Sequence, residues 1–140
     1  MKGQVLFEGG RVREAIAAYQ EAARLAPEQP LIRQGLGRAM VESGDAALLR
    51  PAVQQLQSAL RGEQDDDISW HALGIAWGRL GDLGQANLAL AEAALLQGDI
   101  QGAHGFAAKA EQALPAGPSR LRAQDITNAV KKENRLGDEP

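Results

Sequence analysis

The residues that could carry chemistry are few, and their spacing does not fit a catalytic or metal site. The two histidines, His71 and His104, are far apart, and neither is followed four residues later by a histidine or a carboxylate. Helical metal sites need such pairs because residues one turn apart face the same way. The sequence contains no cysteine and no HExxH, P-loop, GxGxxG, GxSxG or EF-hand pattern. It therefore predicts no catalytic, cofactor-binding or metal-binding residue and no cofactor.

Two other groups resemble binding sites but have simpler interpretations. The run Asp65-Asp66-Asp67 is the best candidate for a cation site, yet acidic residues also favour the start of the helix that follows. Trp70 and Trp77 look like ligand-binding aromatics, but large side chains of this kind also fill the gaps between packed units. We therefore interpret the aspartates as a loop and the tryptophans as packing residues.

The composition narrows both fold and partners. The hydrophobic share of 44% is ordinary for a globular domain, whereas aromatic residues make up only 4% and alanine and leucine dominate. Because strands favour β-branched and aromatic residues, these proportions favour an all-α fold. A net charge of −3 gives no attraction to nucleic acid. The apolar runs are too short to span a bilayer, so no membrane insertion is expected.

Glycines recur at regular intervals. Gly-Asp pairs begin at Gly44, Gly81 and Gly98, and Gly10 holds the equivalent place upstream. The intervals are 34, 37 and 17 residues, the last being half of the first. Such a period is typical of stacked helix pairs, with glycine ending one helix and aspartate capping the next. The half-interval predicts that one helix, over 83–97, closes the third unit and also opens the fourth.

The spacing around the glycines resembles the tetratricopeptide repeat. Trp70, Leu73, Gly74 and Trp77 match its W-x2-L-G-x2-Y pattern with a tryptophan at the tyrosine position. Ala86 and Leu90 match its A-x3-F pattern with a leucine at the phenylalanine position. The resemblance implies an all-α solenoid of antiparallel helix pairs that ends in a capping helix. The small residues expected at the close contacts between helices are Ala15, Gly37, Ala52, Gly74, Ala86 and Ala103.

The expected organisation has three parts. Residues 1–115 form the repeat array, whose first unit lacks its beginning, 116–133 form the capping helix, and 134–140 form a flexible tail. Since the N-terminus has no cap, the chain is expected to be cut from a longer protein. The first predicted helix runs from the start of the chain to about residue 7. The others cover 11–25, 29–41, 51–60, 68–80, 83–97, 100–114 and 119–132. Pro51 is expected at the first position of its helix, after an extra turn over 46–49.

The capping helix is expected to have one apolar face and one polar face. The apolar stripe is expected to contain Leu121, Ile126, Ala129 and Val130. The residues expected to face away are Arg120, Arg122, Asp125, Lys131, Lys132 and Glu133.

The resemblance also implies a binding groove for a protein or peptide. In the tetratricopeptide family, fixed positions of the first helix of each pair face the concave surface. The corresponding residues here are Phe7, Leu31, Gln34, Arg38, Val41, Glu42, Ile68, His71, Ile75 and Arg79. This mixed apolar and charged strip could hold an extended segment or a partner helix.

Residues 88–126 have a narrower resemblance. Residues 88–99, then Leu114-Pro115 and the Leu-Arg-Ala-Gln-Asp-Ile run at 121–126, resemble the C-terminal end of BepA-like periplasmic zinc metalloproteases. The tryptophan expected in the preceding turn is missing. The resemblance implies a periplasmic, non-catalytic arm that recruits substrate or assembly machinery in outer-membrane protein quality control. Zinc would then belong to a separate catalytic domain. The alternatives are a free-standing, self-associating scaffold, a cytoplasmic location, and an enzyme fragment contributing catalytic groups near His71 or His104.

Overall fold

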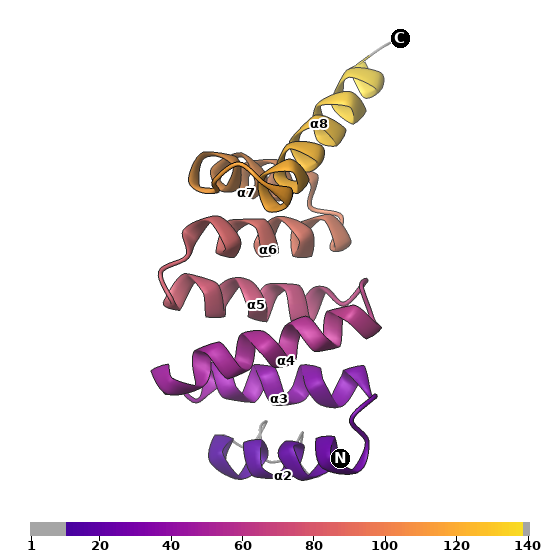
Figure 1. The fold of residues 1–140 in the computed structure, drawn as a ribbon. Helices are drawn as coiled ribbons and strands as arrows, with labels where there is room; N and C mark the ends of the chain where they lie inside the picture. The colour runs from indigo at the N-terminus through magenta and orange to yellow at the C-terminus, as the bar shows by residue number, and fades with distance from the viewer. Residues whose placement is uncertain (1–10, 139–140) are drawn as a thin grey trace.

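The computed structural model describes residues 11–138, with side chains described as far as Lys132. The helices lie one above another in chain order (Figure 1). They are α2 (Val12–Leu25), α3 (Pro30–Glu42), the 3₁₀ helix η1 (Ala46–Leu48), α4 (Leu49–Gly62), α5 (Asp67–Arg79), α6 (Leu83–Leu96), α7 (Ile100–Ala113) and α8 (Pro118–Asp138). No strand occurs among residues 11–138, and consecutive α-helices pack on each other. The prediction of an all-α stack is confirmed, while the predicted helix ending near residue 7 lies outside the described residues.

The Gly-Asp pairs form the turns that the sequence predicts. Gly44, Gly81 and Gly98 have φ values of 73°, 86° and 77°, in the left-handed region that favours glycine. The aspartate that follows each glycine accepts a hydrogen bond from a backbone N–H of the next helix, at 2.9 Å, 3.0 Å and 2.9 Å. Each pair thus ends one helix and starts the next within two residues.

Paired helices approach closely where the sequence places small residues. A Cβ on Gly37 would lie 2.5 Å from Cγ of Leu56 and 3.3 Å from the carbonyl oxygen of Ala52. A Cβ on Gly74 would lie 2.8 Å from Leu90 and 3.2 Å from the carbonyl oxygen of Ala86. Since real Cβ atoms do not approach this closely, α3 could not lie at this distance from α4, nor α5 from α6, with larger residues.

Helix α4 begins earlier than predicted. The extra turn is η1, and α4 starts at Leu49, which makes Pro51 its third residue rather than its first. The proline still removes no hydrogen bond from the helix, because the N–H groups of the first turn have no acceptor within a helix. The prediction of the first position was wrong because the extra turn runs directly into the helix.

Helix α6 belongs to two helix pairs, as the half-interval predicts. It packs on α5 through one side and on α7 through another. Its Ala89 joins the core cluster of α2 to α5, whereas its Leu88, Ala91 and Ala94 join the core cluster of α7 and α8. Nearly every side of α6 is therefore covered, which explains its run of alanine and leucine.

The shared helix changes which helices meet across the stack. Before α6, the first helices of successive pairs touch, so α3 contacts α5. After it, α6 contacts α8, and α6 makes no comparable contact with α4 among the described residues. The inner face therefore moves from the α3–α5 side to the α6–α8 side.

Helix α8 differs from the prediction in its face and its length. Its buried residues are Ala123, Ile126, Thr127 and Val130, whereas Leu121 is 60% exposed and Ala129 is exposed. The stripe includes a threonine because Thr127 bonds to the carbonyl of Gln124 at 3.0 Å. The helix continues to Asp138, beyond the predicted end, so the segment expected as a flexible tail from 134 is helical up to that residue. It leaves the stack at an angle (Figure 1).

Substitution of Gly37 by alanine should destabilise the fold. The added methyl group meets Leu56, which is fully buried and cannot move aside. We expect Gly37→Ala to lower the free energy of unfolding by roughly 1–2 kcal/mol, because overpacking outweighs the gain in helix propensity.

The matched control is Gly105→Ala in α7. A Cβ there has nothing within 4 Å, so only propensity changes, and stability should rise by about 0.5–1 kcal/mol. Urea denaturation followed by circular dichroism measures the free energy of unfolding of both variants. Equal stabilisation of the two variants would contradict the close approach of α3 and α4.

Candidate binding surfaces

Six of the ten residues predicted for the groove line one cleft. Arg38, Val41 and Glu42 come from α3, and Ile68, His71 and Ile75 come from α5. The cleft has a volume of about 400 Å³, and Asp67, Ala72 and Gln97 complete it. We call this set of nine residues the α3–α5 groove. The positions taken from the tetratricopeptide family thus include residues about thirty positions apart in the sequence that lie together in the fold.

The α3–α5 groove has an apolar floor and a polar rim. Val41 and Ala72 are buried and Ile75 is half-buried, so they form the floor. Glu42 and His71 are exposed, and Ile68 is 46% exposed at the edge. Such a surface can bury an apolar side chain of a partner while charged groups set its orientation.

Gln34, predicted to face a partner, instead fixes α5. It is buried, and its Nε2 donates to Oδ2 of Asp66 at 2.7 Å. Asp66 is also the N-cap of α5, since it accepts from the backbone N–H of Ser69 at 3.1 Å and from the Ser69 hydroxyl. Gln34 therefore ties α3 to the start of α5, with Asp66 as the shared acceptor.

Arg79 is also used within the fold. Its Nη1 donates to the carbonyl oxygen of Val41 at 2.7 Å. Val41 lies in the last turn of α3, where a positive charge is favourable, and its carbonyl oxygen also accepts from the backbone N–H of Gly44 at 3.3 Å. Arg79 thus joins the end of α3 to the end of α5 and is not among the residues that line the α3–α5 groove.

Of the remaining two predicted residues, one lies outside the lining of the cleft and the other lies outside the described residues. Leu31 is 64% exposed near the start of α3 and is absent from the lining of the α3–α5 groove. Phe7 lies outside the described residues. Neither position tests the binding role assigned to it, so that role stays a prediction.

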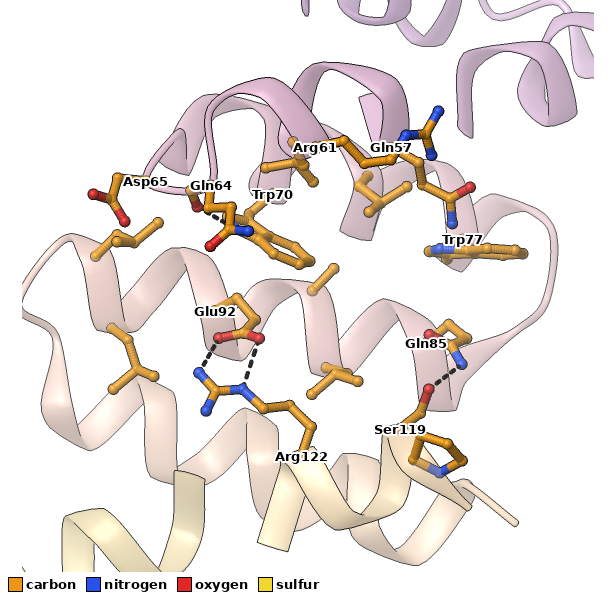
Figure 2. Close-up of a pocket in the computed structure, with 17 residues that line it drawn as sticks. Gln57, Arg61, Gln64, Asp65, Trp70, Trp77, Gln85, Glu92, Ser119 and Arg122 are labelled. Atoms are coloured by element: carbon orange, nitrogen blue, oxygen red, sulfur yellow. Dashed lines mark hydrogen bonds and ion pairs between the residues drawn. The ribbon is translucent and has the colours of Figure 1, made fainter. Parts of the chain in front are cut away.

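A larger cavity, which the sequence did not predict, lies beside α4. It has a volume of about 900 Å³, and α4, α5, α6 and α8 form its walls. Figure 2 shows Trp70 and Trp77 along one wall, with Glu92 and Arg122 opposite. We call it the tryptophan pocket. Its lining also includes Gln57, Leu60, Arg61, Gln64, Asp65, Leu73, Gln85, Leu88, Ala89, Leu95, Leu96, Pro118 and Ser119.

The tryptophans are only half-buried, which refines their interpretation as packing residues. Both pack against the core cluster on one side and line the tryptophan pocket on the other. Trp70 Nε1 donates to the backbone carbonyl of Gln64 at 3.1 Å, which fixes that ring against the α4–α5 loop. The half-interval in the glycine spacing was the signal that could have drawn attention to this surface, because it marks the place where the stacking of the helices changes.

Polar contacts between α6 and α8 form the opposite wall. Arg122 donates to both carboxylate oxygens of Glu92, at 2.9 Å and 2.6 Å, and Gln85 donates to the Ser119 hydroxyl at 3.0 Å (Figure 2). The hydrogen bonds from Arg122 to Glu92 raise the pKa of the Arg122 guanidinium. Arg122 was expected to face away from the array. Instead it holds α8 against α6.

The histidines and the acidic side chains were the candidates for metal binding. No group of three or more histidine, aspartate or glutamate side chains gathers there in a way that could hold a metal ion. His71 lies on α5 and His104 on α7, in different helix pairs. In the part of the chain that is described, no helix combines the length and the apolar character needed to cross a membrane.

Comparison with known proteins gives one family. A family model described as TPR repeat, the tetratricopeptide repeat, matches residues 3–44. The curated proteins give no match. The family match and the stacked antiparallel helices support a tetratricopeptide repeat domain, and the fold is an all-α solenoid of this type.

Loss of the Arg79 contact should weaken the packing of α3 on α5. We expect Arg79→Met to lower the free energy of unfolding by about 0.5–1 kcal/mol, because the carbonyl of Val41 loses a charged donor. Arg50→Met, which removes an exposed arginine from α4, is the matched control and should change stability by less than about 0.5 kcal/mol. Thermal denaturation at low and high salt compares the stability of the two variants. Equal effects would contradict the role of Arg79.

Proposed function

We propose that this chain is a protein-binding module that holds a segment of its partner in the α3–α5 groove. Tetratricopeptide repeats generally mediate protein–protein interaction, and the fold is typically non-catalytic. The observation that carries the proposal is the convergence of Arg38, Val41 and Glu42 with Ile68, His71 and Ile75 in one cleft. An apolar floor beside charged groups suits an amphipathic or extended segment.

The proposal is tested at the edge of the groove, where substitution does not disturb the core. Ile68 is exposed, so Ile68→Asp should leave the helical content unchanged and lower partner affinity at least tenfold. The double variant Arg38→Glu with Ile75→Asp should remove binding, once circular dichroism shows that it is folded. Leu25→Asp, at a residue of α2 that is 69% exposed, is the control.

Photo-crosslinking in the native cell identifies the partner for these titrations. A photoreactive amino acid at position 68 should form a discrete protein adduct, and one at position 25 should not. Adducts of equal yield from both positions, or unchanged affinity in Ile68→Asp, would exclude the α3–α5 groove as the binding surface.

We further propose that the module is the non-catalytic arm of a periplasmic zinc metallopeptidase. The support is the sequence resemblance of residues 88–99 and 121–126 to BepA-like proteins. In that setting the groove would recruit substrate or assembly machinery, and zinc would be bound by another domain. The upstream coding region is the test, since an export signal followed by HExxH is expected. An uninterrupted tetratricopeptide protein without either feature would overturn this assignment and leave the binding module standing.

The alternative is a free-standing scaffold that associates with itself through the same apolar strip. The exposed Leu31 and Ile68 favour this reading, since both could be covered by a second copy. Light scattering over a concentration series separates the two. A mass that rises with concentration, and falls back in Ile68→Asp, supports self-association. A constant monomer mass excludes it.

A further inference from the structure

We propose that the tryptophan pocket binds a proline-rich segment in the polyproline II conformation, with a basic residue placed against Asp65. The pocket is separate from the α3–α5 groove: no residue lines both. The inference therefore does not depend on the function proposed above. It rests on the spacing of the two tryptophans, the unpaired polar groups beside them, and the charge of the adjoining loop.

The spacing of the tryptophans matches the repeat of a polyproline II helix. Trp70 and Trp77 are seven residues apart on α5, which places their Cα atoms about 10.5 Å apart along the helix axis. A polyproline II helix advances about 9.3 Å in three residues, so prolines in a P-x-x-P arrangement lie nearly one tryptophan spacing apart. Aromatic walls of this kind are the surfaces on which proline rings pack.

The polar groups of the pocket favour an extended ligand over a helix. No hydrogen bond from Trp77 Nε1 to another described residue occurs, and the side-chain amides of Gln57 and Gln64 are likewise unpaired among them. A polyproline II segment leaves its own carbonyl groups free to accept hydrogen bonds from such donors. An α-helix has already satisfied most of its carbonyl groups internally and gains less from them.

The walls of the pocket are held in place before a ligand arrives. The bond from Trp70 to Gln64 fixes one ring, and the paired bonds between Arg122 and Glu92 fix the facing wall (Figure 2). Leu60, Leu73 and Leu88, which also line the pocket, are buried. A proline-rich segment is itself stiff, so neither side loses much conformational freedom on binding.

The charge of the α4–α5 loop sets the flanking residue and the direction of the ligand. Residues 63–67 contain four carboxylates and no basic residue. Asp66 caps α5 and Asp67 accepts from Gln97 at 3.2 Å, whereas Asp65 bonds to no other described residue and lines the pocket near Trp70 (Figure 2). A lysine or arginine next to the proline at Trp70 would meet this negative field. Arg61, on the α4 wall, disfavours a second basic residue further along.

The test uses synthetic peptides and the whole chain. The probe is an acetylated and amidated Lys-(Pro)₉ peptide, compared with Glu-(Pro)₉ and with an alanine-based helical peptide that carries leucines seven residues apart. Calorimetry measures the affinity, and tryptophan fluorescence reports on the pocket directly because both tryptophans of the chain line it. We expect saturable binding of Lys-(Pro)₉, with at least threefold weaker binding of Glu-(Pro)₉.

Two variants locate the binding, and a third serves as the control. Trp77→Ala should weaken the binding of Lys-(Pro)₉ at least tenfold. Asp65→Lys, at an exposed residue, should reverse the preference between the two proline peptides without affecting the fold. Ile68→Asp lies in the α3–α5 groove and adds a negative charge next to the loop, so it should not weaken the binding of Lys-(Pro)₉.

Three results would overturn the proposal. They are no saturable signal with Lys-(Pro)₉ up to millimolar concentration, equal or tighter binding of the helical peptide, and an unchanged peptide preference in Asp65→Lys. Since the groove variant Ile68→Asp is measured in the same series, failure here is distinguishable from failure of the function proposed for the α3–α5 groove.

Discussion

The close approach of paired helices through glycine and alanine is the contact on which the rest of the structure depends. At Gly37 and Gly74 the facing helix brings a leucine side chain and a backbone carbonyl within reach of where a Cβ would be. This approach sets the distance between helices in each pair, and so sets how far α3 lies from α5. The α3–α5 groove and the bond from Arg79 to Val41 both require that distance.

The second constraint is that α6 serves two pairs. A regular solenoid keeps all its first helices on one side, which gives one continuous inner surface. Here α6 is followed directly by α7, although a regular array would have two helices in the place of α6. The inner surface therefore moves from α3 and α5 to α6 and α8. The two candidate binding surfaces therefore come from different helix contacts. They differ in chemistry as well, one with a charged rim and the other with two half-buried tryptophans.

The sequence predicted the features that depend on short-range patterns. Gly-Asp pairs located the turns, and the 17-residue interval identified α6 as a shared helix, because both signals can be read along the sequence without knowing which residues meet in space. The tryptophan pocket was not predicted, since it depends on how far α4 lies from α6. The structural use of Gln34 and Arg79 was also missed, because register places a residue on a face but does not choose its hydrogen-bond partner.

The division of the core at α6 has a kinetic consequence. One apolar cluster unites α2 to α5 with Ala89, and a second unites α7 and α8 with Leu88, Ala91 and Ala94. Contacts between helices are mostly between neighbours in the chain, so loop-closure entropy is small and each half can form quickly. Two such halves joined by one helix behave as cooperative units that open separately. Amide protons of α7 and α8 can then exchange with solvent while α3 and α4 stay closed, and each such opening dismantles the tryptophan pocket but spares the groove.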